Sequence, residues 1–216
     1  VIVEEIKMYE DVPDDLVHDL FAQTVWPTHP LGKAIVGTAE VISGLHRNHI
    51  ADYLSSHYTA DRIVIAAAGN IRHQEAVETI VQAFSGLRGT AGERYGLEAP
   101  RMDRGINIRR KDIEQVHLCI GGKGVPQDHD DAYPLHVLST ILGGGSSSRL
   151  FQEIREERGL AYSVFSYQSS FRDAGLFTVY AGMSPAYLGQ VIELILAEMS
   201  RIVESGVAEE EVIRAK

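Results

Sequence analysis

One stretch constrains the fold of this chain more than any other, residues 143–167, which read GGGSSSRLFQEIREERGLAYSVFSY. Consecutive glycines are typical of a helix end, and Ser146 or Ser147 can cap the start of the next helix. The pattern then predicts a short charged helix over residues 149–157 and a strand from Ala161. Three elements are therefore expected in close succession.

The glycines also raise the question of nucleotide binding. A P-loop needs a Lys followed by Ser or Thr after its last Gly, and residues 143–148 contain no Lys. Residues 121–124 read GGKG, but Val125 and Pro126 follow, so neither the Ser/Thr nor a helix start is present. A dinucleotide fingerprint opens a helix directly after a strand, whereas Gly143 follows a predicted helix. The sequence disfavours a nucleotide site.

Hydrophobic periodicity and turn residues predict the remaining elements. Helices are expected over residues 1–26, with a break at Pro13, and over 43–57, 74–84, 130–142 and 185–204. Strands are expected over residues 62–69, 106–110, 115–121, 161–171 and 176–181. Strands and helices do not alternate strictly, so the predicted fold class is α+β.

Composition excludes several classes of function. A formal net charge of -10 argues against a nucleic-acid binder and against attachment to anionic lipid. No apolar run reaches the roughly 20 residues that span a bilayer, so no membrane partner is expected. The single cysteine, Cys119, rules out an intramolecular disulfide and a cysteine-based zinc site, and we expect it to be buried in a strand.

The chain resembles a known family. Residues 143–166 resemble the segment of pitrilysin/insulinase-type zinc metallopeptidases (inverzincins) that carries an Arg and a Tyr toward the active site. The similarity runs nearly end to end, because residues 1–6 resemble the family's helix with the third zinc ligand, residues 29–38 the loop after it, and residues 57–70 a strand–helix junction. The resemblance is to the bacterial processing-peptidase-like members and to the mitochondrial processing peptidases.

The resemblance implies two related α+β domains, each with a mostly antiparallel sheet packed against helices, and both incomplete here. Residues 1–90 are expected to be the C-terminal half of the catalytic zinc domain, residues 91–105 a linker, and residues 106–216 the N-terminal half of a substrate-clamping domain. The chain begins without Met and stops within a predicted helix. We therefore expect an internal fragment of a longer protein.

Three residues align with functional positions of the family. Glu4 aligns with the zinc-binding glutamate, whereas Glu5 points about 100° away on the same helix and cannot share that role. Arg155 and Tyr162 align with the pair that holds the substrate carbonyl, as catalytic and substrate-binding residues. A guanidinium and a phenol are suitable donors to an oxygen that gains negative charge during hydrolysis.

The chain departs from the family in one respect. The family's inverted zinc motif is His-x-x-Glu-His, and none of the nine histidines begins it. His46 and His49 are three apart, but no Glu lies between them and residue 50 is not His. In relatives the motif lies upstream of the position of Glu4. The chain alone therefore holds one of three ligands, and we expect it to bind Zn²⁺ weakly or not at all and to cleave nothing.

The resemblance predicts that the intact protein is a zinc metalloendopeptidase that acts on small or unfolded polypeptides. A bacterial cytoplasmic location and a homodimer, or a heterodimer with a related subunit, are expected with it. Two alternatives remain: a non-catalytic partner or scaffold subunit of the same superfamily, and a standalone α+β binding module. Simpler interpretations also stand, in which Arg155 pairs with a nearby Glu of its own helix and residues 204–211 are a solvated helix start.

Overall fold

A computed structural model of the chain describes residues 1–87, 89 and 98–216. The described residues form two compact units, one of Val1–Thr38 with Ala99–Lys216 and one of Ala39–Glu98. The predicted linker comprises residues 91–105. Residues 91–97 of it lie outside the described residues, and residues 98–105 form neither helix nor strand. Domain boundaries of the intact protein stay a prediction.

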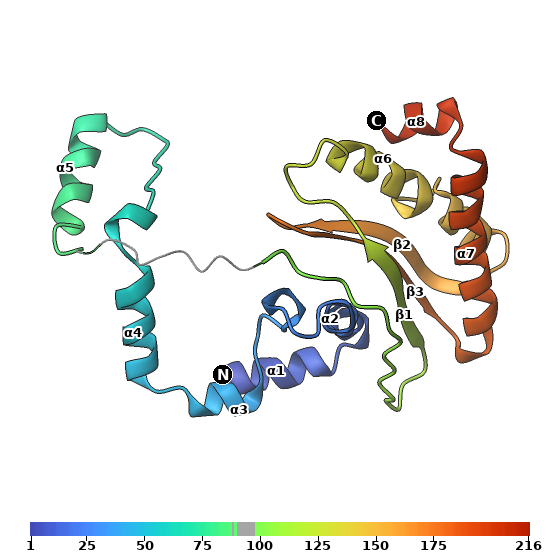
Figure 1. The fold of residues 1–216 in the computed structure, drawn as a ribbon, viewed down its shortest axis with the longest axis horizontal. Helices are drawn as coiled ribbons and strands as arrows, with labels where there is room; N and C mark the ends of the chain where they lie inside the picture. The colour runs from blue at the N-terminus through green and yellow to red at the C-terminus, as the bar shows by residue number, and fades with distance from the viewer. Residues whose placement is uncertain (88, 90–97) are drawn as a thin grey trace. The chain divides into compact units, whose positions relative to one another are not determined.

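A three-stranded antiparallel sheet is the centre of the first unit (Figure 1). Its strands are β1 (Val116–Lys123), β2 (Ala161–Ser170) and β3 (Gly175–Met183), in the order β1-β3-β2. β2 and β3 form a hairpin that is closed by the hydrogen bond from Phe171 N to Ala174 O, 2.8 Å long. The α+β class is confirmed.

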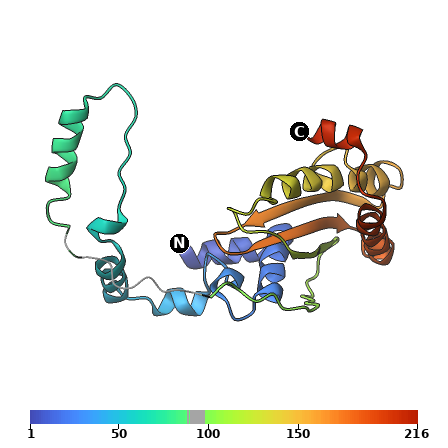
Figure 2. The same cartoon turned by 45° about the horizontal axis from the view of Figure 1, so that its top comes forward.

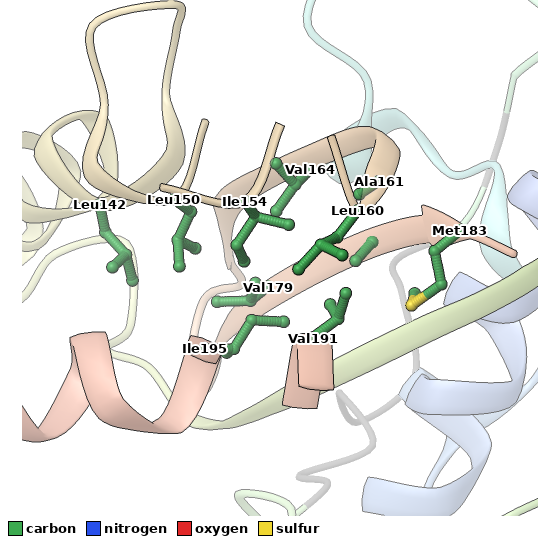
Figure 3. Packing of buried hydrophobic residues seen from close by; sticks show 11 residues of the cluster. Leu142, Leu150, Ile154, Leu160, Ala161, Val164, Val179, Met183, Val191 and Ile195 are labelled. Carbon is green, nitrogen blue, oxygen red and sulfur yellow. The ribbon is translucent and has the colours of Figure 1, made fainter. Parts of the chain in front are cut away.

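Helices cover both faces of this sheet (Figure 2). On one face lie α6 (Ala132–Gly143), the helical segment η3 (Phe151–Glu156) and α7 (Leu188–Ser205), which is preceded by the 3₁₀ turn η4 (Pro185–Tyr187). Alternate residues of β2 and β3 pack against them, because successive strand side chains point to opposite faces. Figure 3 shows this core, which comprises Leu142, Leu150, Ile154, Leu160, Ala161, Val164, Val179, Ala181, Met183, Val191 and Ile195.

The other face of the sheet packs against α2 (Pro13–Val25), which follows α1 (Ile2–Glu10). The predicted break at Pro13 is confirmed, because Pro has no N–H to donate and suits only the first turn of a helix. A second apolar cluster forms here from Val25, Trp26, Ala174 and Leu176, with Phe21, Leu31, Met102 and Phe171 against it. The 3₁₀ turn η1 (Pro30–Gly32) and the C-terminal helix α8 (Glu209–Ala215) complete the unit.

The second unit contains α3 (Ala39–Gly44), α4 (Arg47–His57), the 3₁₀ turn η2 (Ala60–Arg62) and α5 (His73–Ala83). The helix predicted over residues 43–57 is therefore two helices, with a break at residues 45–46. Among the described residues of this unit only Thr59 is buried. Its helices leave apolar side chains such as Tyr53, Leu54 and Val81 exposed.

Two predicted strands are wrong. Residues 63–69 form no strand, and Val64 and Ile65 are exposed. Residues 106–110 form none either, and Ile106 and Ile108 are exposed. A β-branched apolar run forms a strand only when a neighbouring strand satisfies its backbone groups, and within the described residues neither run has one.

Two further expectations concern membranes and Cys119. No described helix is both long and apolar enough to cross a membrane. Cys119 lies in β1 as predicted but is only partly buried. Its Sγ lies 3.5 Å from His18 Nδ1, and burial raises the pKa of its thiol to about 12.

Candidate active-site residues

Arg155 lies on a helical segment with unusual backbone geometry. Residues 151–156 form a π-helical turn, in which Glu157 N donates to Gln152 O across five residues, over 2.9 Å. Such turns are rare in proteins, and those that occur are often found at functional sites. The guanidinium of Arg155 lies over the ring of Phe151, 4.9 Å from its centroid. Arg155 is exposed, so the N–H groups of its guanidinium remain at the surface while the group stacks on Phe151.

No ion pair of Arg155 occurs in the described part of the chain, although three glutamates are near in sequence. Glu153 instead accepts two hydrogen bonds from Arg158, through Nε at 3.1 Å and Nη2 at 2.6 Å. The simpler interpretation, in which Arg155 is paired within its own helix, therefore does not hold for these residues.

Tyr162 occupies an irregularity of the sheet. Ala161 pairs with Met183 and Ser163 pairs with Gly182, so Tyr162 is an extra residue in β2 with no partner in β3. A β-bulge of this kind re-aims a side chain, and bulges are over-represented next to active sites. Tyr162 is 64% exposed at the start of the strand.

A short connection with fixed geometry joins the two residues. Gly159 has a φ of 63°, which favours glycine, and its N donates to Arg155 O over 3.1 Å. Leu160 N then donates to Ile154 O over 2.9 Å. η3 packs directly on β2. The structure thus places Arg155 and Tyr162 on adjoining elements, each at the surface of one core.

Glu4 lies on α1 and is exposed. Its Oε1 accepts a hydrogen bond from Lys7 Nζ at 2.9 Å, and this contact with Lys7 lowers the pKa of the Glu4 carboxyl. The carboxylate is therefore ionised at neutral pH, as a metal ligand must be. The hydrogen bond and ion pair of Glu4 both go to Lys7, and neither of these interactions reaches Arg155 or Tyr162, although all three residues belong to the first unit.

The described residues do not by themselves form a zinc site. Within residues 1–87, 89 and 98–216, no three His, Cys, Asp or Glu side chains are grouped so that they could hold a metal ion. A structural or catalytic zinc site needs at least three protein ligands. Glu4 is one carboxylate outside any such group, so the described residues alone do not fit the ion.

A shallow hollow of about 320 Å³ lies between α2 and β2 in the first unit. Nδ1 of His18 and the Tyr167 hydroxyl are 2.6 Å apart at its wall, and burial raises the pKa of Tyr167 to about 12. The same burial lowers the pKa of His18. Sequence reasoning missed this group, because it joins residues 149 positions apart and no local pattern marks it.

The architecture defines a class of protein: an α+β fold with helices on both faces of an antiparallel sheet, an exposed Arg on a π-helical turn and an exposed Tyr at a β-bulge of the adjoining strand. Its family is shown by sequence. The profile described as "Peptidase M16 inactive domain" matches residues 44–216. The chain belongs to the peptidase M16 family, and the predicted resemblance to this class of zinc peptidases is confirmed.

Similar proteins agree with this assignment. The "Uncharacterized zinc protease YmxG" of Bacillus subtilis is 41% identical over 216 residues, which are 100% of this chain and 52% of that protein. A Streptomyces coelicolor relative, "Uncharacterized zinc protease SCO5738", is 39% identical over 99% of this chain and 48% of that protein. A "peptidase M16 inactive domain" structure from Pseudomonas fluorescens has the same fold, with a TM-score of 0.87 at 23% identity, over 99% of this chain and 52% of that one. The chain thus spans about half the length of the curated relatives it matches.

Proposed function

We propose that the full-length protein is a zinc-dependent metalloendopeptidase of small or unfolded polypeptides, in which this chain supplies one metal ligand and two substrate-binding donors. Glu4 is the ligand, while two histidines and a general base come from an upstream His-x-x-Glu-His segment. Relatives named zinc proteases support the proposal. A cytoplasmic bacterial location and assembly as a homodimer or heterodimer belong to the same proposal.

The observation that carries the proposal is the placement of Arg155 and Tyr162. Both are exposed, and both lie at backbone irregularities in elements that share one buried core. Fixed donors of this kind stabilise a peptide carbonyl oxygen that gains negative charge during hydrolysis, and they lose little entropy in doing so. A zinc ion, when bound in the intact protein, would supply Lewis-acid chemistry at the same carbonyl.

The test is made on the full-length protein, with bound zinc and peptide cleavage as the two readouts. Glu4→Gln is expected to lose stoichiometric zinc, whereas Glu5→Gln, one position along the same exposed helix, is expected to keep it. Tyr162→Phe is expected to lower kcat by about 10²-fold to 10³-fold, the usual effect of removing one such donor. Tyr187→Phe, another exposed tyrosine, serves as its control. Full zinc in Glu4→Gln, or the parent rate in Tyr162→Phe, contradicts the corresponding assignment.

A second candidate is a non-catalytic partner or scaffold subunit of the same family. The matching profile is described as an "inactive domain" and covers residues 44–216, which is most of the chain. This description favours the non-catalytic subunit. The presence of Glu4, Arg155 and Tyr162 favours the peptidase. The upstream sequence separates the two: an intact His-x-x-Glu-His supports the peptidase, and a motif without its glutamate supports the subunit.

A further inference from the structure

A two-bond ion pair joins the segment of Arg155 to the last helix, α8. Arg149 donates to Glu211 through Nε, 2.7 Å from Oε1, and through Nη2, 2.6 Å from Oε2. The two side chains are only 22% and 17% exposed. The Ala208 backbone N also donates to Glu211 Oε2, over 2.8 Å. Two parallel bonds fix the relative orientation of the partners as well as their distance.

Electrostatics support a pair that stays ionised. The hydrogen bonds from Arg149 lower the pKa of Glu211 to about 2. The hydrogen bond with Glu211, and then the charges of Glu211 and Glu198, raise the pKa of Arg149. Glu198 lies on α7, is buried, and pairs with Arg201 at 2.9 Å. Arg149 thus interacts with both α7 and α8. Its main partner, Glu211, is 62 residues away in the sequence.

The pair is attached directly to the structure that presents Arg155. Leu150 and Ile154 follow Arg149 in the same helical stretch, and both are fully buried in the main core. Arg155 is adjacent to Ile154, and its carbonyl oxygen accepts the bond from Gly159 that leads into β2. A rotation or slip of this stretch would therefore move Arg155 and the start of β2 together.

Stability alone is a weak explanation for such a pair. Desolvation offsets much of the attraction between poorly exposed charges, and apolar replacements are often as stable. The best-attested role of these pairs is to select one register among similar packings. A π-helical turn has a close competitor, because its i→i+5 hydrogen bonds differ by only one residue in spacing from the i→i+4 bonds of an α-helix.

We propose that Arg149 and Glu211 are positioning residues, which hold the helical stretch of Arg155 in its π-helical register against α7 and α8. The inference rests on the proposed role of Arg155 in the peptidase. Neither residue of the pair touches the substrate in this proposal, and both act through the placement of Arg155.

The experiment compares three variants of the full-length protein. Arg149→Lys keeps the charge but lacks the planar fork that makes two parallel bonds to a carboxylate, and Glu211→Gln keeps the shape but not the charge. Arg158→Lys is the matched control, because Arg158 also bonds through Nε and Nη2, yet to Glu153 and with its side chain 43% exposed. The readouts are kcat and KM per folded molecule and the relaxation of the Ile154 δ1 methyl group by NMR.

Arg149→Lys and Glu211→Gln are expected to lower kcat about tenfold to a hundredfold, the scale of a misplacement near 1 Å, with KM unchanged. The Ile154 methyl signal is expected to broaden in both, because a second register becomes populated. Arg158→Lys is expected to change neither. An unchanged methyl signal in folded Arg149→Lys overturns the inference, and so does an unchanged kcat where Arg155→Ala is impaired, or failure of both pair variants to fold.

Arg155→Ala separates this inference from the proposed function. If Arg155→Ala cleaves peptides at the parent rate, the substrate-binding role of Arg155 is wrong, while the methyl signal still decides whether Arg149 holds the segment. If Arg155→Ala is inactive and Arg149→Lys is fully active, the proposed function survives and the positioning role does not.

Discussion

At the scale of single residues, His18 connects α2 to the sheet. Its ring lies 5.2 Å from that of Tyr167 and 5.3 Å from that of Tyr180, measured between centroids. Burial lowers the pKa of His18, and the nearby carboxylates of Asp14, Asp15 and Asp19 only partly oppose this. The folded protein therefore favours the neutral imidazole more than the unfolded chain does.

This preference predicts an acid-sensitive contact. Because the folded pKa lies below the unfolded value of 6.5, the unfolded chain binds the extra proton first as the pH falls. The contribution of neutral His18 to stability is full above pH 6.5 and is lost as the pH falls through the folded pKa. Urea midpoints measured from pH 7.5 to 5 should show the loss, and His18→Asn should reduce it. His136→Asn, an exposed control on α6, should leave it unchanged.

Glu211 predicts a separate loss at lower pH. Its folded pKa of about 2 lies below the ordinary value of 4.5, so the stabilisation is present above pH 4.5 and is lost as the pH falls toward 2. Glu211→Gln should weaken the pH dependence of the denaturant midpoint between pH 4.5 and 2, relative to the parent. The same weakening in Glu210→Gln, an exposed neighbour in the first turn of α8, would contradict the assignment to Glu211.

At the scale of elements, the glycines at the end of α6 differ in what surrounds them. A Cβ on Gly143 would lie 2.3 Å from Ser166 N of β2, whereas one on Gly145 would meet nothing within 4 Å. Ser166 Oγ also donates to Ser139 O over 2.8 Å, so helix and strand are in close contact here. The backbone atom of Ser166 belongs to the sheet and cannot move aside cheaply.

Gly143→Ala is accordingly expected to lower the free energy of unfolding by about 1–3 kcal/mol, the usual cost of overpacking. Gly145→Ala, two residues later, should change it by less than about 0.5 kcal/mol, as exposed substitutions do. Denaturant unfolding of both variants measures the difference. If both variants lose the same free energy of unfolding, the position at the helix end explains the need for glycine, and the close contact between Gly143 and Ser166 does not.

Sequence patterns predicted the elements unevenly, and the reason is physical. The helices over residues 73–83 and 132–143 were predicted within two residues, because a helix satisfies its backbone bonds locally. The runs at residues 62–69 and 106–110 had strand composition, but a strand needs a distant partner that composition does not reveal. For the same reason, residues 204–211 were expected to be a solvated helix start, and the pairing of Glu211 with Arg149 was missed.

The sequence predicted which residues belong to the candidate site, but it did not predict the backbone geometry that presents them. Resemblance picked out Arg155 and Tyr162, but neither the π-helical turn nor the bulge has a sequence signal that we used. Each irregularity adjoins a buried residue of the assembled core, Ile154 in η3 and Val164 in β2, and the assembly of that core cannot be read from a local pattern. The roles of Glu4, Arg155 and Tyr162 stay predictions.

At the scale of the whole molecule, the two units differ in what holds them together. The first unit has a fully buried core around β3, where Val179, Ala181 and Met183 have no exposed surface. In the described part of the second unit, the apolar side chains of α4 and α5 remain largely exposed. Apolar burial is the main favourable term in folding, so the second unit gains little of it.

Hydrogen exchange should therefore separate the units in this chain. Amides of β3 are expected to exchange only through global unfolding, whereas those of α4 and α5 should exchange with little protection, because short helices without a packed face are marginal in water. The full-length protein provides the comparison. There the exposed apolar faces of α4 and α5 should gain a packing partner, and their protection should rise by more than about tenfold, or 1.4 kcal/mol. Equal protection of α4 and α5 in the two proteins would mean that these helices need no contribution from the rest of the parent.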